Sequence, residues 1–122
     1  MTQKELKKQM KEEIRRIWID QIKTAMNKAD EAIENCEDNG TCNFDMVMIE
    51  KESTFTYDET IAIFKECGIN ASKGSEWSRY YNGWIGLPNY KGQAERNTKW
   101  AEVFGESLKE QGFTVSMYYQ CD

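Results

Sequence analysis

The first 36 residues contain no proline or glycine, and this feature most constrains the fold. Apolar side chains recur there at three- and four-residue spacing, which predicts one helix over residues 3–36. The apolar positions are Leu6, Met10, Ile14, Ile17 or Trp18, Ile22, Ala25 or Met26, Ala29, Ile33 and Cys36. A helix of that length measures about 50 Å, whereas a compact chain of 122 residues is about 35 Å across. We therefore expect the helix to overhang the rest of the molecule.

The overhanging part of this helix keeps apolar residues as far as Leu6 and Met10. An apolar helix face of this kind is stable in water only when it is covered, so we expect it to pack against another copy of itself. The chain is then a homo-oligomer, a dimer or larger. The alternative is a frayed or bent N-terminal turn on a monomer.

The length of 122 residues and 14.3 kDa is that of one small domain, which excludes two independent cores. We expect residues 1–37 to form the oligomerisation helix and residues 42–122 an α+β body. No apolar run reaches the roughly 20 residues that a bilayer requires. The charged start offers no apolar core for a signal sequence. These features predict a cytoplasmic protein with no membrane partner, in which the four cysteines are thiols.

The body alternates between strand and helix patterns. The run 44–50 has the Val and Ile content of a buried strand, and Thr56 with Glu59 forms a capping box that opens a helix over about 57–67, before Gly68. The remaining predicted elements are a strand over 69–81, a two-residue hairpin at Asn82-Gly83 leading into a strand from Trp84, a helix after Pro88 that ends at Gly112, and a strand over 113–120. This order, βαββαβ, is that of the ferredoxin-like arrangement, so the predicted fold class is α+β.

Histidine is absent, which removes Ser-His-Asp and Cys-His nucleophile systems and Cys2His2 zinc sites. The cysteines at 36, 42, 67 and 121 lack the paired C-x2-C spacing of a zinc ribbon. We expect no catalytic residues, no metal and no cofactor. The net charge of −5 also argues against binding to polymeric nucleic acid. Asp45 lies in an apolar stretch and requires a partner, for which we expect a nearby arginine or a main-chain cap.

Residues 71–100 differ from the rest of the chain in charge. They carry five basic and two acidic residues, a net charge of +3, while the remaining residues sum to −8. They also contain three of the four tryptophans. Cations interleaved with flat rings suit a nucleotide, because phosphates accept charge-assisted hydrogen bonds and a base stacks on a ring. The alternative is that rings such as Trp77, Trp84 and Trp100 are packing residues, and we assign Trp100 to the core.

The junction GQAERNTKW within this segment places polar groups at the start of a predicted helix. Gln93, Arg96, Asn97 and Lys99 lie in or next to the first turns, where unpaired N–H groups favour anions. An arginine in a first turn is also a common solvated surface residue, so spacing alone leaves both interpretations open.

Two segments resemble a known family. They are GTCNFD, Gly40 to Asp45, and GQAERNTKWAEVFGESLKEQGFTVSMYYQ, Gly92 to Gln120, and they look like the first-described family of phage-encoded Thoeris anti-defence proteins. The resemblance covers about a third of the chain and implies a small homo-oligomeric cytosolic protein of the infected bacterial cell. Such proteins bind the cyclic ADP-ribose isomer made by bacterial TIR proteins without cleaving it, and some also bind cyclic oligonucleotides.

The resemblance also implies roles for residues. Members of the family hold the base between an aromatic ring and an arginine, and grip the pyrophosphate with polar side chains at subunit interfaces. We assign Arg96, Asn97 and Gln93 to phosphate and ribose contacts, and Arg79 to a second anion contact. Either Trp77 or Tyr80 is expected to stack on the base. Asn43 and Phe44 belong to the other shared motif, and a structural role suits them equally.

The expected function is therefore sequestration of a nucleotide signal, which blocks Thoeris immune signalling. The first alternative is a small acidic protein that binds and inhibits a host defence nuclease. A nucleotide-cleaving enzyme is a further alternative, but without histidine it would depend on scattered Asp and Glu residues or on a metal.

Overall fold

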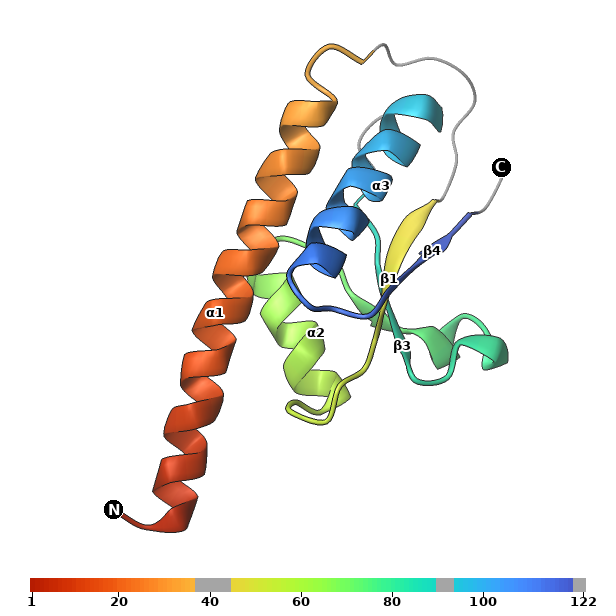
Figure 1. The fold of residues 1–122 in the computed structure, drawn as a ribbon. Coiled ribbons are helices and arrows are strands. Elements are labelled where there is room, and N and C mark those ends of the chain that lie inside the picture. Colours follow the sequence, from red (N-terminus) through yellow and green to blue (C-terminus); the bar gives the residue numbers. More distant parts are fainter. Residues whose placement is uncertain (37–44, 90–93, 120–122) are drawn as a thin grey trace.

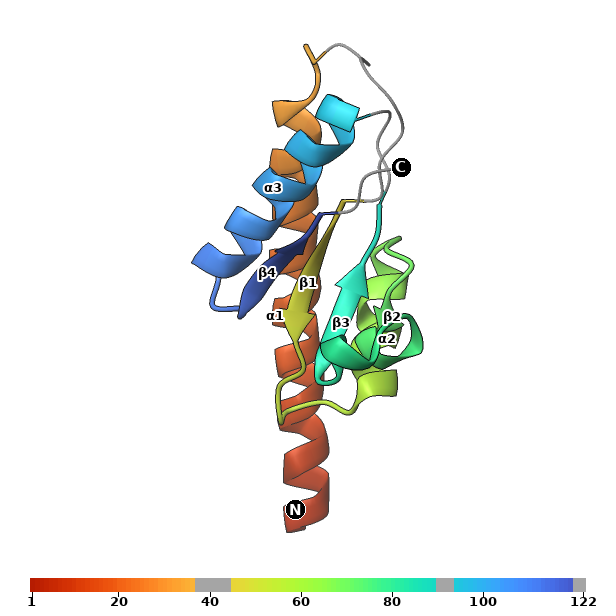
Figure 2. The same ribbon diagram turned by 90° about the vertical axis from the view of Figure 1, so that its right-hand side faces the viewer.

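The computed structural model describes residues 1–36, 45–89 and 94–119. A four-stranded antiparallel sheet is covered on one face by three helices, while its other face is free of α-helices (Figures 1 and 2). The helices are α1 (Gln3–Ala32), α2 (Tyr57–Glu66) and α3 (Ala94–Glu110), and the strands are β1 (Met46–Glu50), β2 (Ser72–Lys73), β3 (Trp84–Leu87) and β4 (Val115–Tyr118). Two short 3-10 helices, η1 (Gly74–Glu76) and η2 (Arg79–Tyr81), join β2 to β3. The predicted α+β class with a long first helix is confirmed.

The strands lie in the order β2-β3-β1-β4, and every neighbouring pair is antiparallel. Because side chains alternate along a strand, each strand presents one set of residues to the helices and another to the open face. Val47, Ile49, Ile85 and Leu87 face the helices and are fully buried there. This inner face and the helices form the apolar core of the described chain.

The helix α1 begins at its N-cap Thr2, whose hydroxyl accepts a hydrogen bond from the N–H of Glu5. It ends at Ala32, four residues before the predicted end. Beyond it, the N–H groups of Ile33, Glu34 and Cys36 bond to carbonyls three residues earlier. These tighter turns keep the apolar spacing that the sequence shows, so the spacing alone does not locate the end of the helix.

The apolar residues of α1 do not form one straight stripe. Trp18, Ile22 and Ala25 are buried against the body, whereas Leu6 and Met10 are 49% and 53% exposed. A step of four residues turns about 40° further around a helix, so a series of such steps winds around the axis. The predicted continuous stripe therefore turns away from the body toward the N-terminus, and that end of α1 projects past the sheet (Figure 1).

The predicted start and stop signals of α2 are confirmed. Thr56 accepts a hydrogen bond from the N–H of Glu59, and the Glu59 carboxylate accepts one from the N–H of Thr56. After the C-cap Cys67, Gly68 has a φ of 93°, a left-handed conformation that favours glycine. The capping box and the glycine thus delimit the helix within one residue of the prediction.

The prediction of a strand over 69–81 with a two-residue hairpin is wrong. Only Ser72 and Lys73 form β2, and residues 74–83, which include η1 and η2, make the connection to β3. The chain folds back tightly here, because a Cβ at Gly74 would overlap the main-chain oxygen of Tyr81. A strand would carry these residues apart. The Asn82-Gly83 turn is present, with Gly83 at a φ of 92°, but it links η2 to β3.

The helix α3 packs between α1 and the sheet. Trp100 is buried, as predicted, and Phe104 and Leu108 are buried too. Gly105 faces the sheet, and a Cβ there would lie 3.2 Å from Val47 Cγ2, 3.3 Å from Val115 Cγ1 and 3.5 Å from Met117 Sδ. The absence of a side chain at this position lets the helix approach β1 and β4 closely.

Candidate functional site

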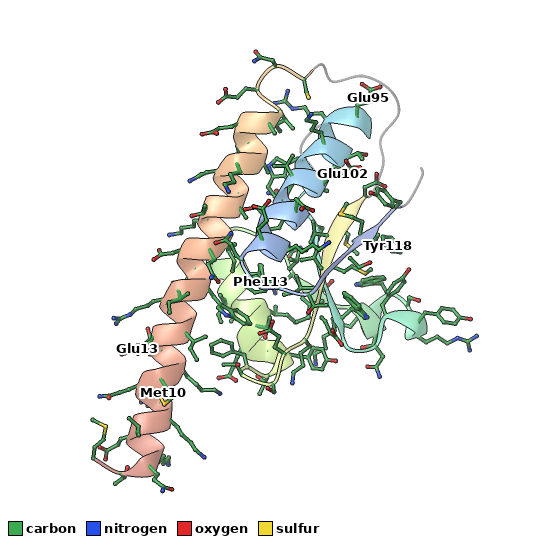
Figure 3. All side chains as sticks on the ribbon, in the orientation of Figure 1. Met10, Glu13, Glu95, Glu102, Phe113 and Tyr118 are labelled. Atoms are coloured by element: carbon green, nitrogen blue, oxygen red, sulfur yellow. The ribbon has the colours of Figure 1, made fainter. Side chains whose placement is uncertain are left out.

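An aromatic cluster lies on the open face of the sheet. The ring of Trp77 contacts the rings of Tyr81 and Tyr118, with ring centroids 4.8 and 5.1 Å away, and the two tyrosine rings contact each other at 5.5 Å. Tyr118, labelled in Figure 3, comes from β4. Trp77 and Tyr81 come from the β2–β3 connection. The Trp77 ring rests over Gly86, where a Cβ would lie 3.2 Å from it. The connection therefore covers part of the sheet that the helices leave open.

The indole nitrogen of Trp77 has no hydrogen-bond partner. Among the buried side-chain nitrogen and oxygen atoms of residues 1–36, 45–89 and 94–119, it alone lacks a hydrogen-bond partner. An unpaired buried donor costs about 1–3 kcal/mol, a cost that an accepting atom brought to it would remove.

The two residues that follow Ser78, Arg79 and Tyr80, form the η2 tip at the edge of this cluster. Tyr80 is 77% exposed, and the Arg79 guanidinium carbon lies 5.1 Å from its ring centroid. Arg79 also donates a hydrogen bond of 3.0 Å to the Tyr80 hydroxyl. Neither Trp77 nor Tyr80 is in a strand, because both lie in the connection between β2 and β3. The structure places Arg79 and Tyr80 together and next to the Trp77 cluster.

The other described candidates hold main-chain groups. Arg96 donates a hydrogen bond of 3.0 Å to the carbonyl of Cys36, just after α1. Asn97 is fully buried and donates one of 3.2 Å to the carbonyl of Asp45. Thr98 donates a hydrogen bond to the Asp45 carboxylate at 2.7 Å, so a threonine hydroxyl contacts the carboxylate for which an arginine or a main-chain cap was predicted. Arg96 and Asn97 thus tie α3 to the chain after α1 and before β1, and their assignment to a ligand stays a prediction.

Three predicted site residues, Asn43, Phe44 and Gln93, lie outside the described residues. The described residues that were predicted to contact the nucleotide therefore lie in two separate places. Arg79, Tyr80 and Trp77 gather at the open face of the sheet, while Arg96 and Asn97 lie at the start of α3.

A large hollow in the described chain, which we call the lysine cleft, was not predicted from the sequence. It has a volume of about 710 Å³ and lies between the N-terminal half of α1 and the segment that carries Phe55 and Glu59. Its cationic walls are Lys4, Lys7, Lys8, Lys11 and Arg15, its carboxylates are Glu12 and Glu59, and its apolar part is Met10, Ile14 and Phe55. The available signal was the spacing of the cations, three, four and seven residues apart on one helix.

Two cations of the lysine cleft are fixed by α2. Lys11 Nζ lies 3.0 Å from Glu59 Oε1, and Arg15 pairs with Glu66. Hydrogen bonding to the Thr56 main chain, followed by Lys11, lowers the pKa of Glu59. The hydrogen bond that Arg15 donates to the Glu66 carboxylate raises the pKa of Arg15. These pairs hold the walls of the cleft in place.

A smaller acidic groove of about 350 Å³ lies between α3 and β4. Glu102 and Glu106 line it together with Lys109 and Tyr119. Desolvation by burial, followed by the charge of Glu102, raises the pKa of Tyr119. The groove presents carboxylates beside a half-exposed aromatic ring.

The structure offers no donor set for metal chemistry in the part of the chain that it describes, where no three His, Cys, Asp or Glu side chains form a possible metal site. Cys36 and Cys67 are free thiols, and desolvation raises the pKa of Cys67. No described helix is long and apolar enough to cross a membrane.

Comparison with known proteins gives no match for this chain among protein-family models, curated proteins or solved structures.

Proposed function

We propose that the protein binds and sequesters a cyclic ADP-ribose isomer made by a bacterial TIR protein, and does not cleave it. It would act in the cytoplasm of an infected bacterial cell as a phage or prophage anti-defence protein that blocks Thoeris signalling. Cyclic oligonucleotides are further candidate ligands. The family resemblance of Gly40 to Asp45 and Gly92 to Gln120 supplies the identity of this ligand.

The observation that carries the proposal is the η2 tip. A cyclic ADP-ribose isomer combines a purine base with a pyrophosphate, and the tip combines an exposed flat ring with a guanidinium beside it. Of the two predicted stacking residues, Trp77 and Tyr80, we favour Tyr80. The Trp77 ring is already in contact with the rings of Tyr81 and Tyr118, whereas the Tyr80 ring is exposed. The Trp77 N–H, which is unpaired within the described residues and lies two positions before Arg79 in the sequence, would donate a hydrogen bond to a ligand oxygen.

Titration calorimetry with cyclic ADP-ribose isomers tests this proposal. Tyr80→Ala is expected to weaken binding by about 1–3 kcal/mol, the usual value of one stacked base. Tyr80→Phe keeps the ring and should bind almost as the original chain does. Heat denaturation of the complex should return the ligand unchanged, whereas a cleaved product would contradict sequestration. Absence of binding by the unaltered protein would overturn the proposal.

The proposed sequestering protein is a homo-oligomer, with the projecting end of α1 as the contact between copies. Leu6 and Met10 are half exposed on that end and are available to a second copy. Removal of residues 1–12 should lower the mass measured by light scattering. An unchanged mass would place the contact elsewhere or show a monomer.

We also propose that the body is ferredoxin-like. The element order β1-α2-β2-β3-α3-β4 and the sheet order β2-β3-β1-β4 support this assignment.

The acidic groove favours a second candidate function, inhibition of a host defence nuclease by direct binding. Glu102 and Glu106 would face a cationic surface of the nuclease, and Tyr119 would supply an aromatic contact. Charge reversal by Glu102→Lys with Glu106→Lys separates the two functions. It should leave nucleotide binding intact and would abolish inhibition if the nuclease is the target.

A further inference from the structure

Two lysines of the lysine cleft lie on the same side of α1 as residues that are buried nearer its C-terminal end. Lys4, Lys11, Trp18 and Ala25 follow one another at intervals of seven residues, so they lie almost directly above one another. Trp18 and Ala25 are buried in the core, whereas Lys4 and Lys11 line the cleft. The cations thus occupy the side of α1 that faces the body, which is an unusual place for charge in a chain that is acidic overall.

The lysine cleft holds more positive charges than its ion pairs neutralise, so its cations repel one another. Lys4 with Lys7 and Lys8, and Lys11 with both of those residues, stand three or four positions apart, and like charges at that spacing destabilise a helix. Lys11 and Arg15 have carboxylate partners on α2. For Lys4, Lys7 and Lys8 the described ranges contain no ion pair. A bound polyanion would relieve this repulsion.

The cleft also offers an apolar surface below these charges. Met10, Ile14 and Phe55 line it, and Lys11 Nζ lies 5.7 Å from the Phe55 ring centroid. Its volume of about 710 Å³ is that of a site for a small molecule. Lysine is a common phosphate-binding residue that acts as a point charge.

From these observations we propose that the lysine cleft binds a phosphorylated small molecule with an apolar or aromatic body. The phosphates would lie among Lys4, Lys7 and Lys8, and the body of the ligand would rest against Ile14 and Phe55. A second copy of the chain is the competing occupant, because its acidic groove with Glu102 and Glu106 matches the cleft in charge.

This inference is independent of the nucleotide site proposed above. The lysine cleft lies in the helical layer, while the η2 tip projects from the opposite side of the sheet (Figures 1 and 2). Variants at one site therefore leave the other in place. The failure of either proposal can be recognised without reference to the other.

Calorimetric titration at low salt with three probes tests the inference on the full chain. ATP carries both charge and a ring, inorganic triphosphate carries charge alone, and adenosine carries the ring alone. We expect ATP to bind more tightly than triphosphate and adenosine to show no measurable binding. Lys7→Gln with Lys8→Gln should weaken ATP binding about tenfold or more, since it removes two charged contacts.

Matched controls locate the effect. Lys23→Gln with Lys28→Gln removes two exposed lysines from α1 outside the cleft and should leave ATP affinity within about twofold. Tyr80→Ala should leave it unchanged. Equal losses in the cleft and control variants, or a loss with Tyr80→Ala alone, would overturn the inference.

Light scattering and circular dichroism complete the test. The exposed Lys7 and Lys8 should be replaceable without loss of helix content or thermal stability. If the original chain binds no ATP and its mass falls on replacement of Lys7 and Lys8, a second copy fills the cleft and the small-molecule site is excluded.

Discussion

The two halves of α1 share one backbone but have opposite surroundings. The C-terminal half buries Trp18, Ile22, Ala25 and Ala29, and α1 packs on α3. The N-terminal half projects beyond the strands, and Met10 and Glu13 mark this part in Figure 3. It directs lysines toward the body and leaves Leu6 half exposed. Both halves of α1 contain apolar residues, but these residues are buried only where they lie on the side of the helix that faces the body.

The adjacent residues Trp18 and Ile17 give the largest expected difference. Trp18 is 7% exposed and contacts the rings of Phe55 and Phe113 at 4.9 and 5.0 Å, so Trp18→Ala should lower the free energy of unfolding by about 3–5 kcal/mol. Ile17 is 54% exposed, and Ile17→Ala should change it by at most about 0.5 kcal/mol. Urea denaturation measures both. Similar losses would show that Ile17 is covered too.

Enlarging a small residue tests how closely the C-terminal half approaches α3. Ala29 is fully buried, and Ala29→Leu should cost about 1–3 kcal/mol through overpacking. Asn27 is exposed on the same helix, so Asn27→Leu serves as the control and should be almost neutral. Thermal denaturation followed by circular dichroism distinguishes the two. A neutral Ala29→Leu would reveal space between the helices.

A hydrogen bond also joins the C-terminal half to α3. The indole nitrogen of the buried Trp100 donates to Asp30 Oδ1 at 2.7 Å. Asp30→Ala should cost about 1 kcal/mol, near the low end for an unpaired donor, because Asp30 is exposed and water can replace its oxygen. Asp30→Asn retains an acceptor and should restore most of the stability in urea denaturation. Equal losses would mean that the charge, and not the hydrogen bond, matters.

The smallest effect is expected from the ion pair of the N-terminal half. The pKa of Glu59 is lowered in the folded chain, so its stabilising effect is present above the ordinary value near 4.5 and disappears as the pH falls through the lowered value. The original chain should lose stability in that range. The Glu59→Gln variant should lose less stability over the same pH range. A stability difference between the variant and the original chain that does not change with pH would contradict this assignment.

Sequence reasoning succeeded where the signal is local. The capping box of Thr56 and Glu59, the periodicity of α3 and the alternation in β4 each lie within one element, and all three elements are present. It failed over residues 69–81, where a strand was predicted and only Ser72 and Lys73 form one. The close approach of Gly74 to Tyr81 folds the chain back there, and this is a tertiary contact with no local signature.

The candidate sites follow the same rule. Arg79 and Tyr80 are neighbours in sequence and were predicted as site residues, and they are found together. Tyr118 on β4 contacts Trp77 but is far from it in sequence. Phe55, which lines the lysine cleft, is likewise far in sequence from the lysines of α1. Lys11 and Glu59 are 48 positions apart, so composition and spacing could not bring them together.

Gly105 imposes a restriction on engineering this protein. Replacing a glycine inside a helix with alanine ordinarily raises stability by about 1 kcal/mol, and α3 offers such a position. Here the added methyl group would press on Val47 and Val115 at once. The gain in helix propensity would be offset by displacement of the helix from two strands, so a search for heat-tolerant variants should leave this glycine untouched and begin at solvent-facing positions of α1.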